Sequence, residues 1–183
     1  MKAAKTRLGL SAVSTLIFAG ACASLPRDVA QGVVNRWQEP SAVAGRQLLD
    51  EYGTPDDVSP RRLTWNHRGA WKRTEVWNRK PVYLSPIDLA VMKQTVDYQL
   101  TSQQAGELLA FSDGLEIDLT RGELSSRSSR EDINYLTLNL ADEIIRGDKT
   151  VAQAQNEFMR QLRLAASGKV SPYMTGLLFP REE

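Results

Sequence analysis

The segment from residue 61 to residue 79 constrains the fold most strongly, because its pattern is that of a β-hairpin. Apolar or aromatic residues alternate with polar ones across residues 63–67 and again across residues 71–77. Residues 68–70 include a glycine and lie between the two runs, where a tight turn is expected. A period of two places every second side chain on one face, so the segment predicts two antiparallel strands with a shared buried face.

The rest of the chain alternates between helical and strand patterns. Further strands are predicted at residues 95–100, 115–119 and 124–126. Helical spacing predicts helices at residues 41–52, 85–94, 101–111, 131–146 and 151–167, with a short additional helix within residues 28–37.

Capping residues mark several of these helix ends. A Ser or Thr followed three residues later by Glu or Gln is typical of a helix start, because each side chain bonds a free backbone amide of the other residue. The matching pairs are Thr101 with Gln104, Ser128 with Glu131, and Thr150 with Gln153, and Ser41 is a further predicted cap. Glycines at positions 53, 147 and 168 are expected to follow helix ends.

The order of these elements indicates the fold class. Helices and hairpins follow one another without the strand–helix–strand rhythm of a parallel sheet. The sequence therefore predicts an α+β fold, in which a small antiparallel sheet built from hairpins packs with several helices, two of them at the C-terminal end.

The first 21 residues form a secretory leader that we expect to be removed. Lys2, Lys5 and Arg7 supply its positive start, and residues 8–19 form an uncharged apolar segment. This segment is too short to cross a bilayer core, which needs about 20 residues. The remaining chain of about 162 residues suits one domain and is long enough to fold without a disulfide or a metal.

The leader ends at Cys22, the only cysteine of the chain. The small residues before it resemble the bacterial lipobox, whose cysteine is lipidated and becomes the new N-terminus, although Ala19 stands where leucine is usual. The same residues also suit ordinary signal-peptide cleavage, so simple secretion is the alternative. We favour lipidation, because a free cysteine is a liability in an oxidising compartment.

The predicted organisation has three parts: a signal peptide at residues 1–21, a lipidated N-terminus and tether at residues 22–40, and a single α+β domain at residues 41–183. Ala23 and Ser24 follow the cysteine, in place of the aspartate that retains lipoproteins of the best-known Gram-negative type in the inner membrane. We therefore expect an outer-membrane lipoprotein that faces the periplasm and is held to the membrane by its lipid. A soluble periplasmic or secreted protein is the alternative.

Charge is nearly balanced overall but uneven along the chain. Three of the 23 basic residues lie in the leader, so 20 basic side chains face 22 acidic ones in the remainder, a net charge of −2. That balance indicates no nucleic-acid partner. Residues 61–80 carry a net charge of +6, however, and residues 88–118 carry −5.

The hairpin combines these cations with three of the four tryptophans and is a candidate binding surface. Its residues would be Trp65, Arg68, Trp71, Lys72, Arg73 and Trp77. Trp and Arg are favoured contact residues, which suits an anionic lipid headgroup, a glycan or an envelope protein as the partner. We favour the alternative, a structural hairpin whose tryptophans cover the core and whose cations pair with the acidic segment.

His67 is the only histidine and lies on the predicted buried face of the hairpin. The common zinc sites need a second histidine or a cysteine, so we expect no metal and favour a structural histidine. The chain has no nucleophile elbow and no phosphate-binding glycine loop. The acid pairs Asp56/Asp57 and Glu131/Asp132 are sequence neighbours, which do not face each other on a helix. We expect no catalytic residue and no cofactor.

Two resemblances to known families complete the sequence evidence. Gly53-Thr54-Pro55 and Leu63-Thr64-Trp65, with the helix before them, resemble small outer-membrane-assembly lipoproteins of the SmpA/OmlA type. This chain continues well beyond that unit, so a role in β-barrel assembly does not transfer. Residues 37–160 resemble a group of exported bacterial proteins without an assigned activity, at Trp71-Lys72-Arg73, Asp97-Tyr98, Arg121-Gly122-Glu123-Leu124-Ser125 and Leu138-Asn139-Leu140-Ala141. This second resemblance implies a single domain and no particular chemistry.

The leader and the lack of a catalytic pattern lead us to expect a non-enzymatic envelope lipoprotein that binds or scaffolds other molecules. The alternative is a small envelope hydrolase that uses carboxylates or His67. That activity would require two or more of these groups to converge within hydrogen-bond reach.

Overall fold

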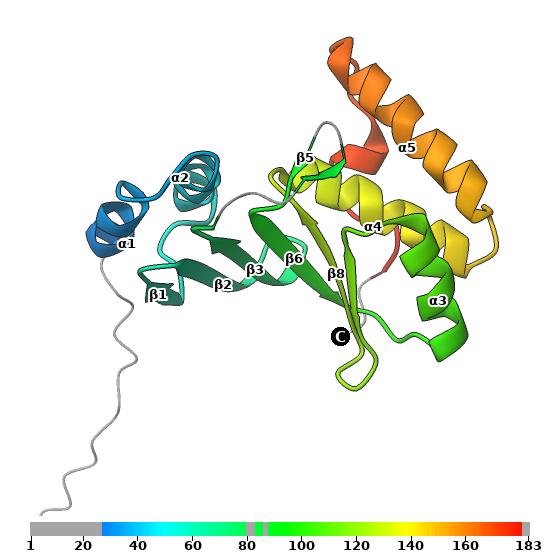
Figure 1. The fold of residues 1–183 in the computed structure, drawn as a ribbon, viewed down its shortest axis with the longest axis horizontal. Coiled ribbons are helices and arrows are strands. Elements are labelled where there is room, and N and C mark those ends of the chain that lie inside the picture. The colour runs from blue at the N-terminus through cyan, green and yellow to red at the C-terminus, as the bar shows by residue number, and fades with distance from the viewer. Residues whose placement is uncertain (1–26, 80–82, 86–87, 181–183) are drawn as a thin grey trace, which may run out of the picture.

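The computed structural model describes residues 27–79, 83–85 and 88–180 (Figure 1). A six-stranded antiparallel sheet, in the order β1-β2-β3-β6-β8-β7, packs with five helices, and the predicted α+β class is confirmed. The sheet strands are β1 (Asp57–Ser59), β2 (Arg62–Arg68), β3 (Trp71–Trp77), β6 (Met92–Asp97), β7 (Leu115–Asp118) and β8 (Glu123–Ser128), and β4 (Tyr83–Ser85) pairs with β5 (Asp88–Leu89) in a separate ribbon. The helices are α1 (Arg27–Val34), α2 (Ser41–Tyr52), α3 (Ser102–Phe111), α4 (Glu131–Ile145) and α5 (Val151–Ala166), followed by the 3-10 turn η1 (Pro172–Met174).

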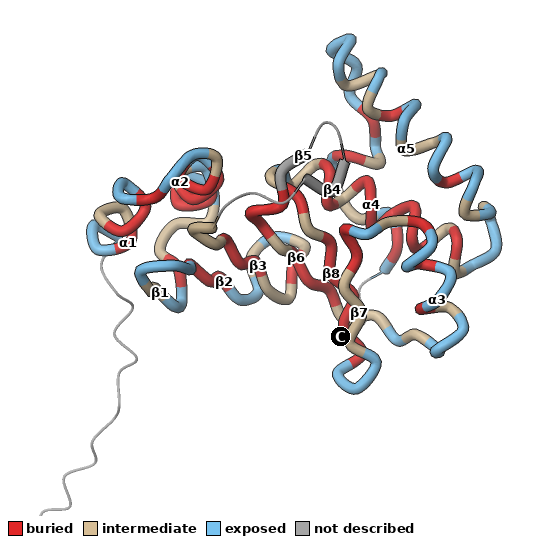
Figure 2. The backbone as a smooth tube through the Cα atoms, viewed as in Figure 1, coloured by how far each residue is buried: buried red, intermediate tan, exposed pale blue. Residues whose placement is uncertain are grey.

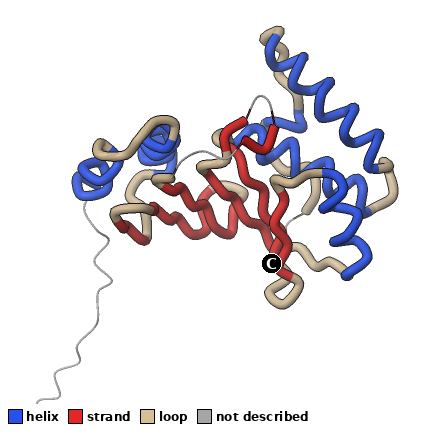
Figure 3. The backbone as a smooth tube through the Cα atoms, viewed as in Figure 1, coloured by secondary structure: helices blue, strands red, loops and turns tan. Residues whose placement is uncertain are grey.

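Two groups of helices cover one face of the sheet (Figure 3). α1 and α2 pack over β2 and β3 around Leu63, Trp65 and Val76, while α3, α4 and α5 pack over the β8 end around Leu124. The strand register places all four of these side chains on the same face. The domain therefore has two apolar clusters side by side on one sheet.

The centre of this covered face is polar. Thr74, Gln94 and Ser126 are direct neighbours across β3, β6 and β8, and all three are buried. Asn134, one turn into α4, is also buried and donates a hydrogen bond from Nδ2 to Gln94 Oε1 over 2.8 Å. A row of polar side chains thus separates the two apolar clusters.

The predicted hairpin is confirmed, with the turn at Gly69 and Ala70 between β2 and β3. The helix predicted at residues 85–94 is wrong, because Met92–Asp97 is the sheet strand β6. Gln94 faces the helices there, so the inward side of this strand is not uniformly apolar and its period of two is hard to recognise. Residues 86–87 lie outside the described part of the chain.

The expected tether at residues 22–40 is partly folded. Within α1, Ala30, Val33 and Val34 are buried in the cluster beneath α2. Trp37 follows, is buried as well, and donates from Nε1 to the carbonyl of Pro60 over 2.9 Å. α1 and Trp37, within the expected tether, therefore pack in the same cluster as α2 and the sheet.

Two of the predicted capping boxes are present, those of Thr101 with Gln104 and Thr150 with Gln153. Ser41 is the first residue of α2 and not its cap, a position that Pro40 occupies. The box predicted for Ser128 and Glu131 does not form, because Arg130 occupies the N-cap position of α4. The carboxylate of Glu131 is engaged with the sheet instead.

Candidate functional site

The tryptophans of the hairpin do not form a surface. Trp65 is 0% exposed and Trp71 is 1% exposed, and Figure 2 shows buried runs within both β2 and β3. Trp65 donates from Nε1 to the carbonyl of Gly53 over 3.0 Å, and Trp71 stacks on Tyr135 of α4 with a centroid distance of 4.6 Å. Trp65 and Trp71 therefore belong to the core and not to the candidate binding surface.

Trp77 is the tryptophan of the hairpin that stays partly exposed. The guanidinium of Arg79 lies 5.0 Å and the ammonium of Lys93 lies 5.4 Å from its ring centroid. Such cation–π contacts stabilise a ring at a sheet surface and cover its faces. Trp77 thus packs beneath charged side chains on the face of the sheet opposite to the helices.

The remaining candidates, Arg68, Lys72 and Arg73, are held in ion pairs. Arg68 lies 3.3 Å from Asp56, and Lys72 lies 2.5 Å from Asp97. The contact with Asp97 joins the basic segment to the acidic one, as the structural interpretation of the hairpin predicted.

Glu123 on β8 is the centre of this ion-pair network. It is almost fully buried and lies 3.0 Å from the ammonium of Lys72 and 2.8 Å from the guanidinium of Arg73. Burial by itself raises the pKa of a carboxyl, but the hydrogen bonds and charges of Arg73 and Lys72 outweigh it and lower the pKa of Glu123 to about 2. These cations are therefore committed to neutralising a buried carboxylate.

A second carboxylate, Glu131, lies where the two helical groups meet. Its Oε1 atom accepts hydrogen bonds from the Tyr52 hydroxyl, from Trp71 Nε1 and, over 2.9 Å, from Gln94 Nε2. Burial and the hydrogen bond to Glu131 raise the pKa of Tyr52, which keeps its hydroxyl protonated as a donor. One oxygen of Glu131, the first residue of α4, thus accepts hydrogen bonds from side chains of α2, β3 and β6.

Glu51 approaches the same carboxylate from the end of α2. Its pKa is raised by partial burial, by the negative charge of Glu131 and by a hydrogen bond with Glu131. The negative charge of Glu131 therefore favours the protonated form of Glu51. The sequence did not reveal this pair, because Glu131 matches a capping box and Glu51 lies 80 positions earlier. Gln94 and Asn134, polar residues at positions where the core requires buried side chains, were the sequence feature that could have indicated a buried polar partner.

His67 is exposed and has a positive φ of 52° at the end of β2. The expectation of a packed or half-exposed histidine on the face of Leu63 and Trp65 is therefore wrong, because the backbone turns away there. In the part of the chain that the structure describes, no group of three or more His, Cys, Asp or Glu residues is arranged to hold a metal ion.

The predicted lipid-attachment site, Cys22, lies outside the described residues, as does the predicted signal peptide at residues 1–21. Over residues 27–79, 83–85 and 88–180, no helix has the length and hydropathy needed to span a bilayer. Comparisons with known protein families, with curated proteins and with solved structures found no match to this chain.

Proposed function

We propose that this chain is an envelope lipoprotein, anchored by its N-terminal lipid, whose α+β domain works by binding or scaffolding rather than by catalysis. The observation that carries the proposal is the leader that ends at the only cysteine, Cys22. The acyl chains of a lipidated cysteine each contribute about 0.8 kcal/mol per buried CH₂, so such an anchor is durable. Outer-membrane attachment with the domain in the periplasm is the favoured arrangement.

The position of α1 supports a short connection to the membrane. Arg27 begins the folded domain five positions after Cys22, and five residues span at most about 18 Å when fully extended. A lipid on Cys22 would therefore hold the α1–α2 end of the domain close to the bilayer. Figure 1 shows α3 and α5 at the opposite end of the molecule, which such an anchor would hold away from the bilayer.

Metabolic labelling tests the anchor directly. Cells that express the full chain are given a radiolabelled or alkyne-tagged fatty acid, and Cys22→Ser is compared with Ser24→Ala as the matched control. We expect label and membrane association in the wild type and in Ser24→Ala, and a soluble, unlabelled protein for Cys22→Ser. A wild-type chain that stays unlabelled, with Cys22→Ser still bound to membranes, would contradict lipidation.

A small hydrolase is the second candidate, because Glu51 and Glu131 converge as that activity would require. A carboxyl with a raised pKa, such as that of Glu51, can act as a general acid. Hydrolysis of nitrophenyl esters and of cell-wall glycans by the purified domain distinguishes the two candidates, with Glu51→Gln as the test and Asp50→Asn as the matched control. Turnover that Glu51→Gln removes and Asp50→Asn retains would favour the hydrolase.

A further inference from the structure

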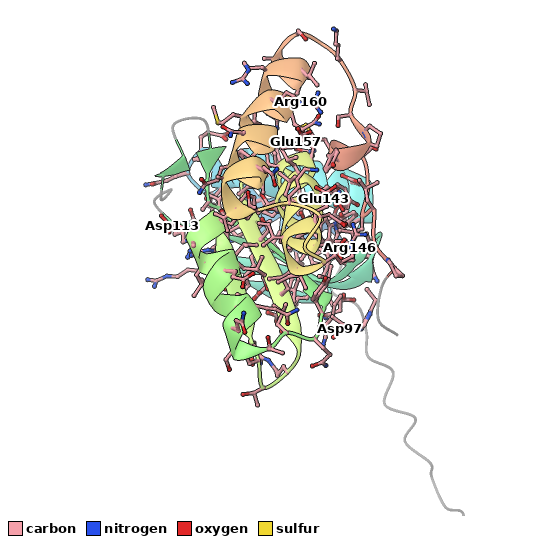
Figure 4. The ribbon with its side chains drawn as sticks, turned by 90° about the vertical axis from the view of Figure 1, so that its right-hand side faces the viewer. Asp97, Asp113, Glu143, Arg146, Glu157 and Arg160 are labelled. Carbon is pink, nitrogen blue, oxygen red and sulfur yellow. The ribbon has the colours of Figure 1, made fainter. Side chains whose placement is uncertain are left out.

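A groove of about 340 Å³ lies between α3 and α5, and its lining includes none of Glu51, Glu123 and Glu131. Figure 4 views the molecule from this side, where α3, α4 and α5 face the reader. The groove is lined mainly by the last turn of α3, the loop that follows it, and the facing side chains of α4 and α5. Pockets that bind ligands have volumes of about 300–1,000 Å³, and this groove lies at the lower end of that range.

Several large apolar side chains line the groove, which is open to solvent. Phe111 and Ile133 are buried at its base, and Phe158 is half-buried beside them. Leu109 on α3 is 56% exposed and Met159 on α5 is 49% exposed. Large apolar side chains that flank one concave site are characteristic of a contact surface.

The mouth of the groove is acidic. Asp113 is exposed at the end of α3, and no described cation lies within ion-pair distance of it. Figure 4 shows Asp113 well separated from the labelled arginines, Arg146 and Arg160. α3 itself carries Glu107 and no basic residue.

Two basic side chains at or beside the groove lining are held in ion pairs. Arg127 lines the groove but lies 3.1 Å from Glu116. Arg160, one position after Met159, pairs with Glu157 of the same helix over 2.6 Å. Of the two charged side chains that line the groove, Asp113 is therefore the one that no described cation pairs with, and a cationic ligand is its complement.

We propose that this groove binds a partner polypeptide, taking one of its apolar side chains between Leu109 and Met159 and holding a neighbouring lysine or arginine at Asp113. The inference rests on the proposed binding function and gives it a site. In protein interfaces, anchor side chains that fill a pocket carry most of the binding energy, and a charged group at the rim adds specificity. Anionic lipid headgroups fit less well, because Asp113 and Glu107 would repel them.

Methionine-methyl NMR tests the proposal without knowledge of the natural partner. The chain beyond the leader has three methionines, and Met92 and Met174 are buried internal controls for Met159. The probes are two octapeptides with a central Leu-Phe pair, one flanked by lysines and one by glutamates. We expect the lysine peptide to shift the Met159 methyl signal saturably, with a Kd below about 1 mM, while the glutamate peptide leaves it in place.

Variants of the full domain show whether the shift reports on the groove. Leu109→Arg should abolish binding, and Asp113→Asn should weaken it about two- to fivefold at low salt. Val43→Arg is the matched control, because Val43 is 51% exposed on α2, at the other end of the molecule, and should bind like the wild type. Circular dichroism confirms that each variant is folded.

Several outcomes would overturn the proposal. These are equal affinity for the glutamate peptide, an unchanged shift in Leu109→Arg, or a Met159 signal that does not move at all. A stronger response to monomeric dodecylphosphocholine would identify a lipid site, and a shift that depends on protein concentration alone would identify a second copy. Each of these results leaves the lipidation test of Cys22 unaffected, so failure of the groove and failure of the anchor are distinguishable.

Discussion

Gln94 Nε2 donates a hydrogen bond of 2.9 Å to Oε1 of Glu131, and this contact joins the centre of the sheet to the start of α4. Gln94 Oε1 also accepts a hydrogen bond from Asn134 Nδ2, so both polar atoms of the Gln94 amide on β6 bond to side chains of α4. Polar groups at such a depth are costly unless they are satisfied. The arrangement therefore fixes how α4 sits over the polar centre of the sheet.

We predict that Glu131→Ala destabilises the domain by about 3 kcal/mol. The substitution leaves Trp71 Nε1, Gln94 Nε2 and the Tyr52 hydroxyl without their common acceptor. Urea unfolding followed by tryptophan fluorescence measures the change. Asp132→Ala is the control, because its carboxylate pairs with the exposed Arg130, and it should change the free energy of unfolding by less than about 1 kcal/mol. Similar effects of the two substitutions would contradict the role given to Glu131.

The pH dependence of stability should carry a component from Glu51. Its pKa is raised in the folded state, so the folded chain binds more protons than the unfolded chain above the ordinary glutamate pKa. This contribution is fully present below the unfolded pKa and is lost as the pH rises through the folded pKa. We therefore expect Glu51→Gln to stabilise the domain relative to the wild type at pH 7, with the advantage shrinking as the pH falls toward 4. Thermal unfolding across that range measures it, and a constant difference would contradict the pairing with Glu131.

Glu123 should act in the opposite direction. Its pKa is about 2 in the folded state, so its stabilising contribution is present above the unfolded pKa and is lost as the pH falls through about 2. Glu123→Gln should cost about 3 kcal/mol at pH 7, because Lys72 and Arg73 lose a buried partner. The difference from the wild type should narrow toward pH 2 in acid titrations of stability. Glu116→Gln, whose side chain is 42% exposed, is the control and should have a smaller effect.

The sequence predicted what depends on neighbouring residues. The hairpin and the boxes of Thr101 and Thr150 formed as expected, because their partners lie within a few positions. The pattern at Ser128 and Glu131 was equally good, yet Glu131 binds donors from 37 to 79 positions away. A capping pattern gives no information about such competing partners, and tertiary contacts decided the outcome.

Trp71 shows why the surface of the hairpin could not be predicted. Counted in steps of two along β3, Trp71 should lie on the same face as Arg73 and Glu75, whose side chains take part in the ion-pair network. Trp71 packs on Tyr135 of α4 instead, on the opposite face. Lys72 and Arg73 both reach Glu123, so strict alternation breaks at the start of β3. A prediction from alternating side chains assumes a regular strand. Where the strand is locally irregular, the side chains before the irregularity lie on the other face of the sheet.

Asn139 should hold the C-terminal segment in place. From α4 its Nδ2 donates to the carbonyls of Tyr173 and Gly176, and its Oδ1 accepts from the amide of Leu178 over 2.7 Å. We predict that Asn139→Ala increases hydrogen exchange across residues 171–179 and lowers the free energy of unfolding by about 2–3 kcal/mol. Asn156→Ala, on the exposed side of α5, is the control and should leave exchange in this segment unchanged.

Two glycines allow opposite predictions from the same substitution. Gly122, in the turn between β7 and β8, has a φ of 60°, and a Cβ there would lie 2.2 Å from Gln99 Nε2. Gly106 lies in α3, where a Cβ meets nothing within 4 Å. The Gln99 side chain can move aside, but the left-handed backbone remains unfavourable for alanine, so Gly122→Ala should cost about 1 kcal/mol. Gly106→Ala should instead stabilise the domain by about 0.5–1 kcal/mol, because alanine has the higher helix propensity. Thermal unfolding of both variants measures the pair, and a stabilising Gly122→Ala would show that the turn does not need its left-handed conformation.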